Sequence, residues 1–457
     1  MNVLVLGSGG REHALAWKLR ESQLTERVFC APGNAGIAQT AECVPVDLNN
    51  PAAMFELAER MDAQLTVVGP EAPLVAGVVD EFEQGGRKII GPSKAAASLE
   101  GSKIFAKEFM QRHGIPTARF VVAEDYPSAL KAISEFGLPV VIKADGLAGG
   151  KGVVVARSRE EAEKNLDDFM NRMVLGAAGK RVVIEECLVG EELSFIVLAG
   201  KRGFVPLVPT QDHKAVFDDD RGPNTGGMGA YSEDTILGGD LQEEILRRIV
   251  RPTLDGMGED GTPYRGFLYC GLMLTPEGPK VLEYNVRLGD PETQPIMMRL
   301  RSDLVELLMA SLEGLEGQLE AVGARWSPNP AVCVVLTSKG YPGKSETGKA
   351  ITGLEAAEAR GGVKVFHGGT ASRKGKLLTA GGRVLGVTAV AEDLGTAIEK
   401  AYAAVGKIHF DGMHYRHDIG AKGMRRLKTA SEIGKPRDPA ENSAPPQRTV
   451  GGETAKG

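Results

Sequence analysis

The sequence predicts a multidomain protein of mixed α/β and α+β class, and three observations lead to this prediction. Its 457 residues are more than one hydrophobic core usually organises. Residues 1–100 alternate short apolar runs with helical patterns, which predicts a parallel sheet covered by helices. From residue 102 onward, strand-like runs follow one another across glycine loops, which is typical of antiparallel or mixed sheets.

The N-terminal α/β domain is expected to span residues 1–101. Buried strands are predicted at 3–6, 65–68 and 88–90, because each is a short apolar run bounded by polar or glycine residues. Helices are predicted at 12–20 and 74–83. This order of elements favours parallel strands with helices on both faces of the sheet.

The central α+β domain is expected at 102–325. A helix is predicted at 103–113, because Gly114 and Pro116 follow it as stop signals. Strands are predicted at 139–144, 152–156, 181–186 and 193–198, with a polar helix at 159–173. Residues 267–286 predict two further strands, and 303–312 predicts a helix.

A small C-terminal α+β domain is expected at 326–427. It begins with a linker-like segment and is predicted to hold strands at 332–336, 363–366 and 383–389 and a helix at 394–405. From Lys428 onward only Ile433 and Val450 are large apolar side chains. Such a segment cannot bury a core, so residues 428–457 are predicted to be a disordered tail.

The overall composition excludes several classes of function. A net charge of −6 argues against general affinity for nucleic acid or anionic membranes. No apolar run has the length of a membrane span, and the first residues enter a strand directly, so we expect a cytoplasmic protein. The five cysteines are scattered without a CxxC pair, which predicts small buried side chains and neither a disulfide framework nor a thiolate metal site.

The N-terminal segment VLVLGSGGREH places Gly7, Gly9 and Gly10 between a strand and a helix. The start of a helix favours an anion, so a phosphate could bind here. A dinucleotide fingerprint would need a third glycine where this chain has Glu12, and an acidic residue about 20 residues later that is missing. Three interpretations stay open: a tight structural turn, a substrate-phosphate site and a nicotinamide site.

The segment PVVIKADGLAGGKGVVVA combines lysines with a glycine-rich loop. Lys143 closes an apolar strand, and four glycines surround Lys151. Two ammonium groups beside exposed backbone amides suit a triphosphate. The segment is not a P-loop, because Lys151 is followed by glycine and then by a strand. The alternative is a glycine hairpin with solvated lysines.

The segment KVLEYNVRLGDPE predicts a metal-binding strand face. Alternation along a strand places Glu283, Asn285 and Arg287 on one face. Carboxylate and amide oxygens suit Mg²⁺ bound to nucleotide phosphates. Arg287 can take a carboxylate or phosphoryl group, and Asp290 follows in the same segment. A solvated amphipathic strand is the alternative.

Two polar segments are weaker candidates for binding. RVVIEECLVGEELSF carries four acids on a connection between strands, which could offer backbone groups to adenine and a carboxylate to ribose, although solvated acids are the alternative. QDHKAVFDDDRGPNTGGMGAYS is a long polar loop, and such loops are usually functional or disordered. We expect it to cover the substrates.

Together these segments resemble the ATP-grasp superfamily and, within it, the phosphoribosylamine–glycine ligase family. The resemblance covers residues 1–427 and rests on GSGGREHALAW, APGNAG, VGPEAPLV, IKADGLAGGKGV, QDHK, GPNTGGMGAY and EYNVRLGDPETQPI. The family typically has DGLAAGKG where this chain has Gly149–Gly150. The resemblance implies a central ATP-grasp fold with a lid subdomain at about 118–190, and a monomer or weak homodimer.

The resemblance also implies a reaction. ATP would phosphorylate glycine, and the amine of 5-phosphoribosylamine would attack the glycyl phosphate, giving glycinamide ribonucleotide in de novo purine biosynthesis. Such chemistry needs cations around the transferred phosphoryl group and exclusion of water. The 146–152 and 212–229 loops are therefore the expected lids.

By motif, the resemblance assigns each group of residues a role. ATP would contact Lys103, Lys143, Gly149, Gly150, Lys151, Glu185, Glu186, Leu188 and Glu192. Mg²⁺, or alternatively Mn²⁺, would bind Glu283 and Asn285, and the catalytic residues would be Arg287, Asp290 and Lys214. Phosphoribosylamine would face Gly9, Gly10, Arg11, Gly69, Pro70 and Glu71, with Asp212 near the substrates.

Three rival functions fit the sequence less well. A sibling ATP-grasp enzyme, such as a purine-pathway carboxylase or formyl transferase, is disfavoured by the GPNTGGMGAY and GREH segments. A nucleotide-dependent oxidoreductase is disfavoured by the missing ribose acid. A non-catalytic ATP sensor is disfavoured because Glu283, Asn285, Lys143 and Lys151 are all present.

Overall fold

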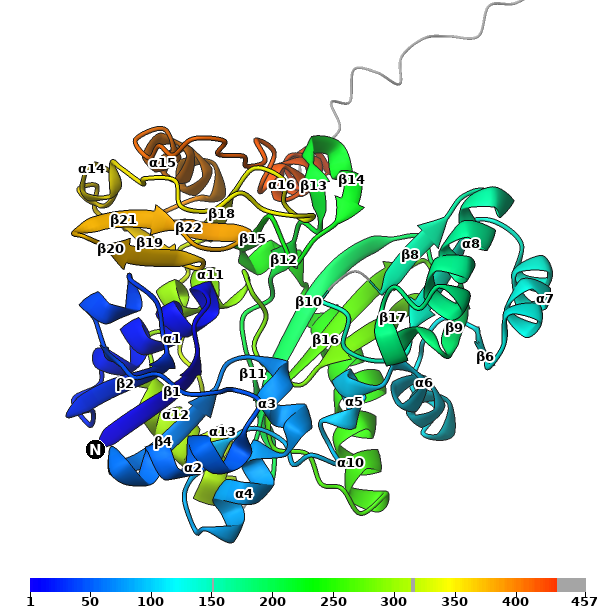
Figure 1. Ribbon diagram of the computed structural model, residues 1–457, viewed down its shortest axis with the longest axis horizontal. Coiled ribbons are helices and arrows are strands. Elements are labelled where there is room, and N and C mark those ends of the chain that lie inside the picture. The colour runs from blue at the N-terminus through cyan, green and yellow to red at the C-terminus, as the bar shows by residue number, and fades with distance from the viewer. Residues whose placement is uncertain (150–151, 314–316, 434–457) are drawn as a thin grey trace, which may run out of the picture.

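The computed structural model describes residues 1–149, 152–313 and 317–433 (Figure 1). Helix α16 (Ala421–Ile433) runs past Lys428, so the predicted tail begins too early; the rest of it, 434–457, lies outside the described residues. Within the described residues, no helix is both long and apolar enough to cross a membrane.

The N-terminal domain is built on a parallel sheet in the order β3-β2-β1-β4-β5, as the sequence predicts. β2 and β3 are added on one side of β1, and β4 and β5 on its other side. The strand order therefore reverses between β1 and β4, and ligands commonly bind at the carboxyl ends of the strands at such a switch point. The predicted helix at 74–83 is two helices, since Gly77 adopts a left-handed φ of 99° between them. The elements are β1 (Asn2–Gly7), α1 (Gly10–Arg20), β2 (Arg27–Pro32), β3 (Glu42–Cys43), α2 (Pro51–Arg60), β4 (Ala63–Val68), α3 (Glu71–Ala76), α4 (Val78–Gln84) and β5 (Ile89–Ile90).

The central domain contains two antiparallel sheets. One has the order β11-β10-β16-β17, and the smaller one has the order β6-β9-β7-β8. The smaller sheet carries α7 and α8 and lies on the side of the larger sheet away from the N-terminal domain (Figure 1). The strands are β6 (Phe120–Ala123), β7 (Val140–Ala144), β8 (Val153–Ala156), β9 (Val182–Glu186), β10 (Glu191–Ala199), β11 (Phe204–Pro206), β16 (Gly266–Thr275) and β17 (Gly278–Asn285).

The chain between residues 98 and 322 also forms helices. The predicted polar helix at 159–173 is α8 followed by a π-helical turn at Asp167–Asn171. Helix α6 begins at Lys103, because Ser102 caps it by accepting the Phe105 N–H at 3.1 Å. The helices are α5 (Ser98–Gly101), α6 (Lys103–Arg112), α7 (Tyr126–Phe136), α8 (Arg159–Leu166), α9 (Gly239–Ile245), α10 (Arg251–Glu259), α11 (Thr293–Arg299), α12 (Leu304–Glu313) and α13 (Gln318–Val322).

The C-terminal sheet has the order β12-β15-β18-β22-β19 and recruits two strands from the central part of the chain. The polar segment at 212–229 is therefore not a free loop: β12 and β15 anchor its ends, and β13 and β14 form a hairpin within it. The elements are β12 (Gln211–Asp212), β13 (Ala215–Phe217), β14 (Arg221–Asn224), β15 (Gly229–Ser232), β18 (Ala331–Thr337), α14 (Leu354–Glu358), β19 (Val363–His367), β20 (Thr370–Arg373), β21 (Lys376–Thr379), β22 (Arg383–Val390) and α15 (Leu394–Val405).

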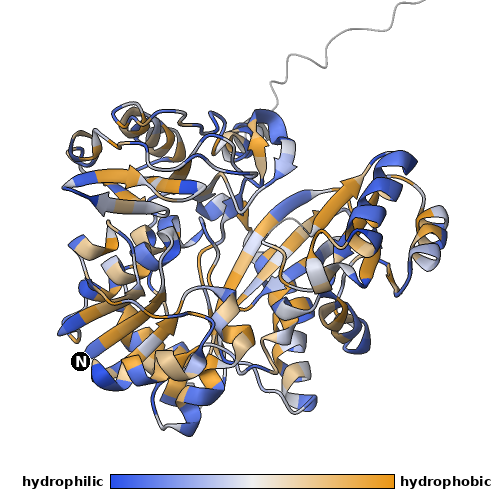
Figure 2. Cartoon of the chain, in the orientation of Figure 1, coloured by the Kyte–Doolittle hydropathy of each residue, from blue (hydrophilic) through white to orange (hydrophobic). Residues whose placement is uncertain are grey.

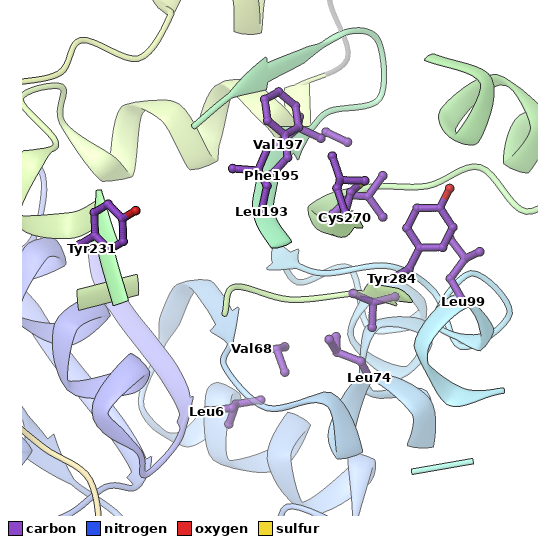
Figure 3. Packing of buried hydrophobic residues seen from close by; sticks show 14 of the residues in the cluster. Leu6, Val68, Leu74, Leu99, Leu193, Phe195, Val197, Tyr231, Cys270 and Tyr284 are labelled. Atoms are coloured by element: carbon purple, nitrogen blue, oxygen red, sulfur yellow. The ribbon is translucent and has the colours of Figure 1, made fainter. Parts of the chain in front are cut away.

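Buried apolar side chains join the three regions. One cluster runs from Leu6 and Val68 in the N-terminal sheet to Phe195 in the central sheet and Tyr231 in the C-terminal sheet (Figure 3). The strands of the large central sheet are mostly apolar, whereas polar residues gather on outward-facing helices (Figure 2). This cluster spans the domain boundaries, so the three regions share one buried core.

Candidate active site

A cavity of about 480 Å³, here called the main cavity, lies where the three domains meet. The N-terminal domain supplies Arg11, Pro70 and Glu71, and the C-terminal domain supplies Tyr341 and Arg383. The remaining lining residues come from 100–292: Glu100, Lys103, Leu147, Ala148, Gly149, Gly152, Val153, Asp212, Lys214, Asn224, Thr225, Gly226, Tyr269, Glu283, Tyr284, Asn285, Arg287, Gly289, Asp290 and Glu292.

The candidate metal ligands lie on one wall of this cavity. Glu283 and Asn285 occupy the end of β17 and line the cavity together, and Arg287, just beyond the strand, lines it as well. The Lys214 ammonium, 3.4 Å away, lowers the pKa of the Glu283 carboxyl to about 2. Glu283 is therefore ionised at neutral pH, as a Mg²⁺ ligand must be.

The donor set fits a nucleotide-bound metal better than an all-protein cage. Among the residues that the structure describes, no group of three or more His, Cys, Asp or Glu side chains could hold a metal ion. Mg²⁺ commonly takes one or two protein oxygens together with phosphate oxygens and water. Glu283 and Asn285 supply two hard oxygens in that manner, and Asn285 Oδ1 currently accepts the Arg287 Nη2–H at 3.1 Å.

Arg287 is held between two acidic side chains. Its guanidinium donates to Glu100 Oε1 at 2.9 Å and to Glu71 Oε2 at 3.2 Å. Although burial opposes charge there, Glu100 and Glu71 raise the pKa of Arg287. Since Glu71 belongs to the N-terminal domain, this contact ties the switch point of the parallel sheet to the metal-binding strand.

Lys214 connects the metal wall to β10. Its ammonium lies 3.1 Å from Glu192 Oε2 as well as 3.4 Å from Glu283 Oε1. Burial opposes its charge, but the two carboxylates raise the pKa of Lys214 well above its usual value. Asp212, at the end of β12, lines the same cavity, and burial together with Glu292 raises the pKa of its carboxyl.

Glu185 holds two buried lysines at the interface of the two central sheets. Lys143 Nζ lies 3.0 Å and Lys107 Nζ 3.1 Å from Glu185 Oε2. Lys143 also donates to Leu282 O at 2.9 Å, beside the bulge where β17 is out of register with β16. Burial lowers the pKa of Lys107 to about 8. The other oxygen, Glu185 Oε1, is buried and has no hydrogen-bond partner within the described residues.

Only some of the remaining predicted nucleotide contacts line the main cavity. Lys103 and Gly149 line the main cavity, and Gly149 has a left-handed φ of 56°. Gly150 and Lys151 lie outside the described residues. Glu186 pairs with Arg119 at 2.8 Å, and neither Glu186 nor Leu188 lines the main cavity.

The N-terminal glycine turn packs around Glu12. This buried carboxylate accepts Arg11 Nε at 2.6 Å, and a Cβ on Gly69 would lie only 2.0 Å from Glu12 Oε1. Gly69 is therefore needed to make room for Glu12 and does not line the main cavity, although Pro70 and Glu71 do. Gly9 and Gly10 line a neighbouring cavity instead.

Arg383 brings the C-terminal domain into the site. Its guanidinium donates to Asp290 O at 2.6 Å and to Asp290 Oδ2 at 3.0 Å, and it also contacts Gly226 O. Tyr341 Oη accepts the Gly226 N–H at 2.9 Å. Burial opposes the charge on Asp290, but Arg383 and Arg11 hold the pKa of its carboxyl below the usual range.

Several residues of the main cavity were not among the sequence candidates. Glu292 belongs to the same GDPE segment as Asp290, so this segment is the local signal that indicates it. Glu100, Tyr269, Tyr341 and Arg383 carry no comparable local pattern, because each reaches the site only through tertiary packing.

Matches to family models cover all three domains. The central domain matches "Phosphoribosylglycinamide synthetase, ATP-grasp (A) domain" over residues 101–293, so fold and site define an ATP-dependent ligase of the ATP-grasp class. The N and C domain models of the same synthetase match residues 1–100 and 331–422. The chain belongs to the phosphoribosylglycinamide synthetase family, which confirms the resemblance found in the sequence.

Individual relatives agree with the family models. The phosphoribosylamine–glycine ligase of Xylella fastidiosa (strain Temecula1) is 50% identical over 433 residues, which cover 94% of this chain and 100% of that protein. The enzyme of the same name from Pseudomonas aeruginosa is 50% identical over 434 residues, with the same coverage. The crystal structure of phosphoribosylamine–glycine ligase from Thermotoga maritima is 37% identical, covers 92% of this chain and 100% of that one, and has a TM-score of 0.78.

Proposed function

We propose that this protein ligates glycine to 5-phosphoribosylamine through a glycyl phosphate, producing glycinamide ribonucleotide, ADP and phosphate for de novo purine biosynthesis. One observation carries the proposal. A single cavity joins a metal-competent strand face, Glu283 and Asn285, to the switch point of the parallel sheet at Arg11 and Glu71. Nucleotide and sugar-phosphate chemistry can therefore meet within one enclosed space.

ATP is proposed to bind between the two central sheets. Lys143 and Lys103 would contact its phosphates, and the buried acceptor Glu185 Oε1 would take a donor from the adenine. Glu186 and Leu188 stay proposed backbone contacts at the adenine edge, and Glu192 a ribose contact. Gly149, with Gly150 and Lys151 beside it, would close over the phosphates as part of a lid at about 118–190.

Glu283 and Asn285 would hold Mg²⁺, with Mn²⁺ as the alternative ion, and the metal would offset charge on the transferred phosphoryl group. For Asn285 to do so, Arg287 must release Asn285 Oδ1, which frees part of its guanidinium for the glycine carboxylate or the acyl phosphate. Lys214, whose ammonium lies 3.4 Å from Glu283, would stabilise the same developing charge from beside the metal ligands.

Phosphoribosylamine is proposed to enter from the glycine turn of the N-terminal domain. Gly9, Gly10, Arg11, Gly69, Pro70 and Glu71 would surround it, directly or by shaping the turn, and Asp212 would lie near the substrates. Asp290 is ionised and stands between the two cavities, so its carboxylate can orient the attacking amine. We also propose that the enzyme acts in the cytoplasm as a monomer or weak homodimer, on small molecules and on neither nucleic acid nor membranes.

One assay tests the proposal. Purified protein, Mg-ATP, glycine and freshly generated phosphoribosylamine should release ADP only when both cosubstrates are present. Because the acyl phosphate requires glycine, ADP release that does not depend on glycine would overturn the assignment. The oligomeric state is measured separately by sedimentation across a range of protein concentrations.

A further inference from the structure

A second cavity of about 250 Å³ adjoins the main cavity on the far side of Asp290. Asp290 and Arg383 line both cavities, so they form the boundary between them. One wall is the turn Ser8–Gly10 of the N-terminal domain, and the opposite wall is Gly368–Gly369 of the C-terminal domain. Gln294, from α11, lines it as well.

The two glycine walls are tied together by one side chain. Asn34 Nδ2 donates to Ser8 O at 2.8 Å, to His367 O at 2.7 Å and to Gly368 O at 3.1 Å. These hydrogen bonds join the two walls, so the cavity lies within the packed interface between the first and last domains.

The start of α1 gives this cavity an affinity for anions. The first N–H groups of a helix have no intrahelical acceptor and carry the positive end of the helix dipole. Glu12 accepts the Gly9 N–H at 2.5 Å and is itself paired with Arg11, so the N–H groups that follow Gly9 are the ones that can face an anion. Gly9 and Gly10 line the cavity without a side chain, and a Cβ on Gly10 would lie 2.6 Å from Gln294 Nε2. The guanidinium of Arg383 adds positive charge at the boundary.

Gln294 provides an independent sign of a ligand. Its side chain is 2% exposed, and Nε2 donates to Asp290 Oδ1 at 2.8 Å. Its Oε1 is buried and has no hydrogen-bond partner within the described residues. A buried carbonyl without a donor is costly, so this oxygen favours a ligand that brings an O–H or N–H group. The missing side chain of Gly10 leaves space beside this amide.

We infer that the second cavity binds the phosphate and ring of the sugar-phosphate substrate, and that Gln294 determines specificity by accepting a ring hydroxyl. The phosphate lies at the start of α1, and the ring passes Asp290 so that C1 and its amine face the main cavity. This inference rests on the proposed function. It adds Gln294 and the Gly368–Gly369 wall, which belongs to the C-terminal domain, to the substrate site.

The test uses ribose 5-phosphate as a stable probe, because it carries the phosphate and the ring hydroxyls. Calorimetry compares the affinity for ribose 5-phosphate with the affinities for its 2-deoxy and 3-deoxy analogues. The measurements are made on wild type, on Gln294→Met and on the exposed control Gln39→Met. Because one neutral hydrogen bond is lost, we expect the affinity to fall roughly five- to tenfold when the hydroxyl that makes this bond is removed. Wild type should show this loss for one deoxy sugar, and Gln294→Met should bind that sugar and ribose 5-phosphate equally.

Two results overturn the inference. One is a wild-type protein that binds all three sugars equally; the other is a Gln294→Met protein that still discriminates against the deoxy sugar. A uniform loss for all three sugars in Gln294→Met would mean that Gln294 acts only through Asp290, which also contradicts it. Glycine-dependent ADP release by wild type is measured in parallel, so failure of the proposed function is recognised separately.

Discussion

Arg383 of the C-terminal domain donates to Asp290 Oδ2 of the central domain at 3.0 Å. The same guanidinium holds Asp290 O and contacts Gly226 O, so one side chain fixes both the boundary of the two cavities and the segment over them. Arg383→Met should lower kcat/KM for phosphoribosylamine by roughly 100-fold, because small misplacements of reacting groups have effects of that size.

The matched control for this change is Arg373→Met, which removes an exposed arginine from β20 of the same domain. Steady-state kinetics with each substrate varied in turn measures the effect. An Arg383→Met enzyme with unchanged kcat/KM would mean that the C-terminal domain does not position Asp290.

Glu283 is the stronger of the two candidate metal ligands, because its carboxylate is charged whereas Asn285 is neutral. Glu283→Ala should abolish turnover while leaving the fold intact, and Glu283→Gln should weaken the apparent affinity for Mg²⁺ by more than about 100-fold. Magnesium titration of the ATP-dependent rate measures this, with the exposed Glu277→Gln as control. An unchanged rate at saturating Mg²⁺ in Glu283→Ala would remove Glu283 from the metal site.

Lys214 sets the ionisation of Glu283, since its charge is the largest cause of the lowered pKa. In wild type the Glu283 carboxyl loses its charge only as pH falls toward about 2, so it does not limit metal binding at pH 5. In Lys214→Met the pKa of the Glu283 carboxyl should rise. The decrease in Mg²⁺ affinity with falling pH should therefore begin at a higher pH than in wild type. Magnesium titrations between pH 4 and pH 7 compare the two proteins; coincident profiles would contradict the assignment.

His213 is a buried base whose effect should appear in stability. Burial lowers its pKa to about 3, and neither ring nitrogen has a hydrogen-bond partner within the described residues. The unfolded chain takes up this proton near pH 6.5 and the folded protein only near pH 3, so stability should fall as pH drops through that window. Denaturant unfolding of His213→Asn should show a weaker fall than wild type between pH 6.5 and pH 4.

Glu185 pairs with two buried ammonium groups, so its removal should destabilise the protein. Glu185→Gln should lower the free energy of unfolding by about 3–5 kcal/mol, because it leaves buried charge uncompensated. The KM for ATP should rise as Lys143 loses its position. The Glu186→Gln control loses only the pair with the exposed Arg119, for which we expect less than about 1 kcal/mol. Equal destabilisation in both variants would contradict a role specific to Glu185.

Period-2 alternation predicted one wall of the main cavity before any fold was known. Glu283 and Asn285, two residues apart at the end of β17, both line it, because alternate residues of a strand share a face. Arg287 lies beyond the strand and reaches the same cavity through the segment that follows. The alternation of strands and helices in residues 1–100 likewise predicted a parallel sheet, which the structure confirms.

The segment at 212–229 shows where local reasoning stops. Its polar residues indicated a loop, yet β15, which begins at its last residue, pairs with β18 about 100 residues later. A strand of this kind is stabilised by distant partners and by burial, and neither can be recognised in the segment itself. Gly69, which the resemblance places at the substrate, also makes room for Glu12 of α1, and no local pattern indicates that contact.

By itself the sequence determined the chemistry of this protein: lysines in a glycine loop, a carboxylate–amide pair on a strand, and motifs long enough to identify the family. Those features are local, because they depend on residue type and on the repeat of the backbone. Only the tertiary structure decided that Arg383 reaches Asp290 and that Asn34 ties Ser8 to Gly368. Those contacts join residues far apart in the chain, and burial of the shared core brings them together.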